Sequence, residues 1–108
     1  KLEAAGVEVL QTAEAHGVNL RQLMKLLGER KIDSILLEGG GTLNASARQG
    51  QIVSKVYAYI AGKLIGGREA PSPVSGEGAS RMSEAVQLKE MEIRQFGEDI
   101  LVTGYPGR

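Results

Sequence analysis

The hydrophobic pattern along the chain changes period from segment to segment, and the first half predicts strands alternating with a helix. Residues 20–30 place apolar side chains at 20, 23, 24 and 27, the single stripe of an amphipathic helix, and Asn19 can cap it. Residues 6–12 (GVEVLQT) favour a strand with Val7 and Val9 on one face. Residues 32–38 contain an unbroken apolar run, which is typical of a strand covered on both faces in a parallel sheet.

The second half predicts a further helix, a strand, a long loop and a hairpin. Residues 42–50 favour a short helix, and residues 54–65 favour a strand. Residues 66–80 are rich in Gly, Pro and Ser and indicate a loop, followed by a turn of helix within 80–85. Residues 86–95 and 99–104 then predict an antiparallel hairpin that turns at Gly97. The fold class is therefore α/β, with a mainly parallel sheet flanked by helices and a C-terminal antiparallel hairpin.

Composition narrows the range of partners and chemistry. The 13 basic residues balance the 13 acidic ones, which argues against binding nucleic acid through its backbone. No apolar run approaches the roughly 20 residues that span a bilayer, so we expect no membrane segment. The chain has no cysteine and a single histidine, His16, so we do not expect a metal site. The absence of cysteine also suits a reducing compartment, so we expect a cytoplasmic location. Since it begins at Lys1 within an apparent fold, we expect a fragment whose upstream part is missing.

The segment with most chemical content is ILLEGGGTLNAS, residues 35–46. It reads as a buried strand, a carboxylate, three glycines and the start of a helix. The first amides of that helix would point unpaired N–H groups outward at the positive end of the helix dipole, which suits a pyrophosphate. The pattern is neither the dinucleotide fingerprint nor a P-loop, and a tight turn that only needs flexible backbone remains an alternative.

Glu38 ends the predicted central strand. A carboxylate there would lie at the mouth of the crevice in which α/β sheets bind ligands, where it could accept hydrogen bonds from substrate hydroxyls. The alternative is a carboxylate satisfied by neighbouring backbone amides.

Other residues offer weaker possibilities. Tyr57 and Tyr59 share a strand face and favour packing or an interface. Lys63 could meet a phosphate or simply lie in solvent, and the 66–80 loop could be a lid or a plain connection.

Residues 35–46, together with VSKVYAYIAGKLIGG at 53–67, resemble the reductase domain of the bifunctional riboflavin-biosynthesis deaminase/reductase family. Members are similar to dihydrofolate reductase in fold and carry a strand ending LxEGG or LxEAG, then Thr and a short helix, then a strand ending in IAPKLLGG or a variant. QFGEDILVTG at 95–104 also resembles the family's last hairpin. The resemblance runs from about residue 6 to residue 104, and it implies that residues 1–108 are the C-terminal portion of a dihydrofolate-reductase-like domain.

The resemblance implies a reaction and a set of site residues. NADPH would deliver hydride to C1′ of the ribose of 5-amino-6-(5-phosphoribosylamino)uracil and give the ribityl product. Glu38 corresponds to the glutamate that contacts substrate. The residues that correspond to the NADP-binding stretch are Gly40, Gly41, Thr42, Leu43, Asn44, Ala45 and Ser46. No side chain is required as a nucleophile, because the cofactor carries the chemistry.

Some features of the family pattern have no counterpart in residues 1–108. Gly62 stands where members usually have Pro, and we expect the upstream half of the reductase and the zinc deaminase domain to lie outside this stretch. We therefore expect the isolated fragment to be inactive. We also expect the protein to be a homo-oligomer, such as a dimer. The alternatives are another dihydrofolate-reductase-like NADPH reductase, or a non-catalytic oligomerisation fragment that associates through its hairpin and tyrosine face.

Overall fold

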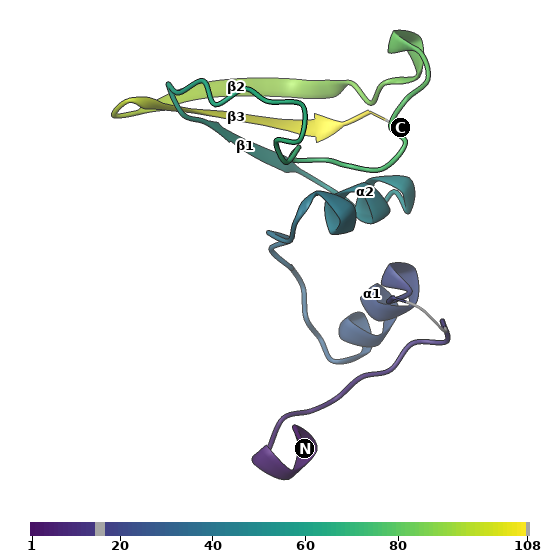
Figure 1. Ribbon diagram of the computed structural model, residues 1–108. Coiled ribbons are helices and arrows are strands. Elements are labelled where there is room, and N and C mark those ends of the chain that lie inside the picture. The colour runs from purple at the N-terminus through teal and green to yellow at the C-terminus, as the bar shows by residue number, and fades with distance from the viewer. Residues whose placement is uncertain (15–16, 108) are drawn as a thin grey trace. The chain divides into compact units, whose positions relative to one another are not determined.

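The computed structural model describes residues 1–14 and 17–107, which form two compact units, Lys1–Leu37 and Glu38–Arg108. Figure 1 labels the helices and strands of both. His16, the residue considered for metal binding, lies outside the described residues. No helix in the described part of the chain has the length and apolar character needed to cross a bilayer.

Unit Lys1–Leu37 is organised around helix α1 (Leu20–Glu29), preceded by the short 3₁₀ helix η1 (Glu3–Ala5). The predicted cap is confirmed, because the Asn19 side-chain oxygen accepts a hydrogen bond from the Gln22 amide at 2.9 Å. Gln22 in turn accepts from the Ala13 amide at 2.8 Å, which ties the incoming chain to the first turn. The predicted apolar stripe is half-buried, whereas Lys25 is exposed.

The strands predicted at 6–12 and 32–38 are not present in the structure. Both segments carry apolar side chains, but these stay exposed: Val7 is 46% exposed and Leu36 is 77% exposed. A strand needs a neighbouring backbone that completes the ladder of hydrogen bonds, and neither segment has one among the described residues. The hydrophobic pattern identified side chains suited to burial, and it could not identify a pairing partner.

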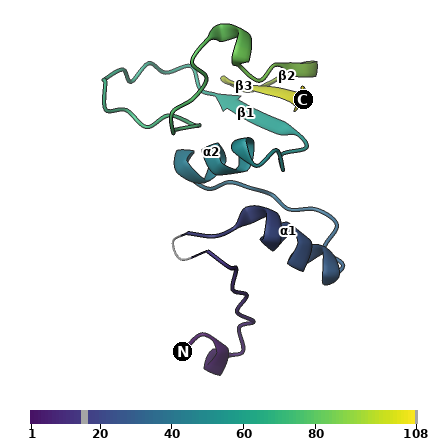
Figure 2. The ribbon, with the colours of Figure 1, turned by 90° about the vertical axis from the view of Figure 1, so that its right-hand side faces the viewer.

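Unit Glu38–Arg108 contains helix α2 (Gly41–Gln49) and a sheet made of β1 (Val56–Ile60), β2 (Leu88–Phe96) and β3 (Asp99–Pro106). The strand order is β1-β3-β2, and α2 lies on the β1 side of the sheet in both views (Figures 1 and 2). Both strand pairs are antiparallel. The expected mainly parallel sheet is therefore not found among the described residues, because its two candidate parallel strands, 6–12 and 32–38, do not form.

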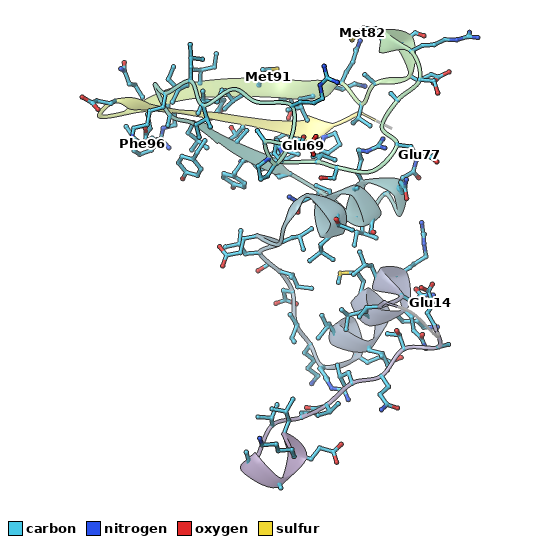
Figure 3. All side chains as sticks on the ribbon, in the orientation of Figure 1. Glu14, Glu69, Glu77, Met82, Met91 and Phe96 are labelled. Atoms are coloured by element: carbon cyan, nitrogen blue, oxygen red, sulfur yellow. The ribbon has the colours of Figure 1, made fainter. Side chains whose placement is uncertain are left out.

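The hairpin prediction is confirmed. Phe96 pairs with Asp99 across a two-residue turn in which Gly97 has a φ of 59°, a left-handed conformation that glycine adopts without strain. Figure 3 shows Phe96 at this turn and Met82, in the 3₁₀ helix η2 (Met82–Glu84), at the opposite end of the sheet. Leu101 and Thr103 on the central strand β3 are buried, and with Ala45 and Ala47 of α2 they form the small core.

Candidate functional site

The candidate site is the junction at which Glu38 and three glycines lead into α2. Helix α2 begins at Gly41, and Gly40 is its N-cap with extended backbone, φ −71° and ψ 176°. The first intrahelical hydrogen bond is donated by the Asn44 amide to the Gly40 carbonyl at 3.1 Å. The amides of Gly41, Thr42 and Leu43 have no acceptor in the part of the chain that the structure describes. The predicted unpaired N–H donors are therefore present at the positive end of the helix dipole.

The three glycines of the junction have different surroundings. A Cβ on Gly39 would collide with the Leu43 side chain. A Cβ on Gly41 would lie 2.5 Å from the Ser72 carbonyl oxygen and closer still to the Ser75 hydroxyl. A Cβ on Gly40 would meet nothing within 4 Å. Only Gly40 therefore keeps an open face that a ligand could approach, while the other two glycines accommodate the protein itself.

Glu38 lies two residues before the N-cap and is exposed. Among the described residues nothing donates a hydrogen bond to its carboxylate, so the alternative in which neighbouring amides satisfy it is not observed. A carboxylate near a helix N-terminus is favourably placed with respect to the helix dipole. Glu38 therefore presents an unused acceptor close in sequence to the free amide donors.

Some of the other residues in the predicted cofactor stretch contact the rest of the protein, and some are exposed. The Asn44 side-chain amide donates to the Pro73 carbonyl at 2.8 Å, and Ala45 is buried. Thr42 and Ser46 are exposed one helical turn apart, and the Ser46 hydroxyl donates to the Thr42 carbonyl at 3.2 Å. The stretch therefore has one side used by the protein and another side exposed.

The 66–80 loop reaches this junction, a contact that the sequence analysis missed. The Ser75 amide donates to the Gly41 carbonyl at 3.0 Å. The only signals in the sequence were the third glycine of the junction and a side-chain amide at Asn44, and both were interpreted as features for ligand binding. The loop runs out from β1 and returns beside α2 in both ribbon views (Figures 1 and 2).

The tyrosines lie on strand β1. Tyr57 and Tyr59 are 55% and 67% exposed. Lys55 places its ammonium 5.0 Å from the centroid of the Tyr57 ring and 5.2 Å from that of Tyr105. A side-chain hydrogen bond to Tyr57 is the main reason that the pKa of Lys55 lies above its usual 10.5. Tyr59 packs near Phe96, with ring centroids 6.5 Å apart.

Neither Lys63 nor Gly62 adds a group to the junction, and the same holds for two cavities elsewhere in the described chain. The Lys63 side chain is exposed, and a Cβ on Gly62 would meet only the Glu98 carbonyl oxygen, at 3.8 Å. A cavity of about 490 Å³ lies in the first unit and is lined by residues of the segments 10–12, 14, 17–18 and 23. A second of about 240 Å³ is lined by Ala85, Gln87, Lys89 and Gly107. Neither cavity includes Glu38 or the first turn of α2.

Comparison with known proteins places the chain in a family. Residues 1–102 match the model of the RibD C-terminal domain. The chain is 48% identical over 98 residues to the riboflavin biosynthesis protein RibD of Actinobacillus pleuropneumoniae, an alignment that covers 90% of this chain and 26% of that protein. It is 39% identical over 85 residues to the 2,5-diamino-6-ribosylamino-4(3H)-pyrimidinone 5′-phosphate reductase of Methanothermobacter thermautotrophicus, covering 79% and 39% of the two chains.

Solved structures agree on the fold. A RibD structure from Acinetobacter baumannii superposes with a TM-score of 0.80 at 23% identity, covering 99% of this chain and 29% of that one. The chain thus spans about a quarter of the length of the RibD proteins that it matches. On the match of the family model over residues 1–102, the chain belongs to the RibD C-terminal domain family.

Proposed function

We propose that this chain supplies part of the cofactor and substrate site of an NADPH-dependent reductase of riboflavin biosynthesis. The reaction is the reduction of 5-amino-6-(5-phosphoribosylamino)uracil at C1′ of its ribose to give the ribityl product. The observation that carries the proposal is the set of free amides on Gly41, Thr42 and Leu43, beside the open face of Gly40. Membership of the RibD C-terminal domain family supports the same reaction class.

The residues present fit a dinucleotide phosphate. An anion at a helix N-terminus gains about 0.3–1 kcal/mol from the helix dipole, and the three free amides can in addition donate hydrogen bonds to its oxygens. The exposed hydroxyls of Thr42 and Ser46 add polar groups on the same helix. When bound, the dihydronicotinamide supplies the hydride.

Glu38 is the residue that we assign to the substrate. Its carboxylate is exposed and accepts no hydrogen bond from the described chain, so it is free to accept hydrogen bonds from sugar hydroxyls. Its role is to orient the ribose, because a reaction between two bound molecules gains most from correct placement of the reacting atoms. The proposed reaction requires no covalent bond to Glu38 or to any other side chain.

A second candidate function differs in the substrate ring. The Methanothermobacter relative is named for a diaminopyrimidinone phosphate, and it is 39% identical to this chain. The two substrates share the phosphoribosylamino group that Glu38 would meet, so the residues described do not distinguish them. Comparing kcat/KM for the two pyrimidines in the full-length protein separates the two candidates.

The test of the proposed function uses two variants of the full-length protein. We expect Gly40→Val to raise the Kd for NADPH at least about tenfold, because a Cβ at this position meets no protein atom within 4 Å and the branched side chain would occupy the open face. A factor of ten corresponds to about 1.4 kcal/mol. We expect Glu38→Gln to leave that Kd within a few-fold and to lower the rate of NADPH oxidation about a hundredfold. Calorimetric titration and single-turnover absorbance at the nicotinamide band measure the two effects.

Gly62→Ala is the matched control, because its Cβ also has room and it lies away from the junction. Wild-type affinity for NADPH in Gly40→Val, or full reductase activity in Glu38→Gln, would contradict the assignment of that residue.

A further inference from the structure

The segment of residues 72–76 is docked on the first turn of α2 by hydrogen bonds at both of its ends. The Ser75 amide donates to the Gly41 carbonyl at 3.0 Å, and the Asn44 side-chain amide donates to the Pro73 carbonyl at 2.8 Å. Within the segment, the Ser72 hydroxyl donates to the Val74 carbonyl at 2.9 Å and closes a tight turn. Ser75 is half-buried although it belongs to a long loop of Gly, Pro and Ser. This part of the loop is therefore held in place.

The docking uses a single face of the helix. Gly41, Asn44 and Ala45 stand at positions i, i+3 and i+4, which lie one above another on an α-helix. Gly41 meets Ser72 and Ser75, Asn44 meets Pro73, and Ala45 lies beneath Gly76.

The contact at Gly76 is close. A Cβ there would lie 3.3 Å from the Cβ of Ala45, and Gly76 has a φ of 81°. Glycine is therefore the residue best suited to both the approach and the backbone conformation.

The docking leaves the donors of the first turn untouched. The loop is bound through the Gly41 carbonyl and the Asn44 side chain, while the amides of Gly41, Thr42 and Leu43 have no acceptor in the described chain. The loop therefore covers one side of the turn and leaves the N–H groups open. Such an arrangement suits a wall that fixes a ligand's position without competing for its hydrogen bonds.

We infer that Asn44 is a positioning residue, whose side-chain amide holds residues 72–76 as one wall of the cofactor site. This inference rests on the proposed function. It assigns two kinds of contact to the seven residues of the stretch. The wall is supported by the Gly41 carbonyl, Asn44 and Ala45. The cofactor is contacted by Gly40, by the side chains of Thr42 and Ser46, and by the backbone amides of Gly41, Thr42 and Leu43.

The test combines a local structural readout with a binding readout. In the full-length protein without NADPH, we expect Asn44→Ala to raise amide hydrogen exchange at Ser75 about five- to tenfold, as follows from the loss of one hydrogen bond. We expect the Kd and the KM for NADPH to rise several-fold, with kcat at saturating NADPH nearly unchanged. We expect Asn44→Ser to give the same result, because the serine hydroxyl is too short to reach the Pro73 carbonyl. This variant replaces Asn44→Ala in the test if the alanine variant does not fold. Gln49→Ala, exposed on the same helix, is the control.

Each contrary result overturns the inference in a different way. A raised Kd with unchanged exchange at Ser75 would mean that Asn44 contacts the cofactor directly. Raised exchange with an unchanged Kd and KM would mean that the loop is a plain connection. Failure of the wild-type protein to bind NADPH would instead refute the proposed function, while the exchange result would still report the docking.

Discussion

At the residue scale, identical amino acids have unequal roles because their surroundings differ. Gly39, Gly40 and Gly41 are indistinguishable as a sequence pattern, and the pattern left open whether they serve a ligand or only a tight turn. In the structure only Gly40 has an open face, whereas the other two face protein atoms. The sequence could indicate that backbone freedom is needed at this place. It could not indicate whether a ligand or another part of the chain fills the space.

Gly41 gives a stability prediction at this scale. We expect Gly41→Ala to lower the free energy of unfolding by about 1–3 kcal/mol, because its Cβ overlaps Ser72 and Ser75 and must displace the docked loop. Thermal and urea unfolding of the protein measure this change.

Gly62→Ala provides the matched comparison. Its Cβ has room, and its φ lies outside the positive range, so we expect a gain of about 0.4–1 kcal/mol from the reduced freedom of the unfolded chain. Equal effects of the two substitutions would show that the space around Gly41 does not constrain the residue there.

At the scale of elements, local patterns were reliable and pairing between distant segments was not. Helix α1, its Asn19 cap and the hairpin at Gly97 were predicted because their determinants lie within a few residues of one another. Helix α2 was predicted one residue late, because its N-cap is a glycine with no side chain to mark it. The prediction of a mainly parallel sheet was wrong for the described residues, whose strand pairs are antiparallel. An apolar run such as 35–37 indicates a segment suited to burial, but it carries no information about which strand would pair with it.

The cap of α1 yields a prediction for this element. We expect Asn19→Ala to destabilise the first turn by about 1 kcal/mol, because the Gln22 amide loses its acceptor. Amide hydrogen exchange at Gln22 and its neighbours should rise about fivefold. Lys25→Ala, on the exposed side of the same helix, should leave that exchange unchanged. Equal exchange at Gln22 in Asn19→Ala and the wild type would mean that the cap contributes nothing to the helix.

At the scale of the whole molecule, the chain belongs to the RibD C-terminal domain family. The fold agrees with RibD structures, while the chain spans about a quarter of their length. Within the described residues, the junction before α2 combines free donors, one open glycine and an unused carboxylate in a stretch of six residues, 38–43. The resemblance implied each of these residues individually. The structure adds which of them have groups still available to a ligand.

The most direct measurement follows the backbone amides of the full-length protein by heteronuclear NMR while NADP⁺ is added. We expect the amide signals of Gly41, Thr42 and Leu43 to shift in a saturable way with one common Kd, since these are the donors left open at the helix N-terminus. The Gln49 amide, in the last turn of the same helix, serves as the internal reference. Saturable binding of NADP⁺ that leaves the three amide signals in place would contradict the proposal that this junction holds the cofactor.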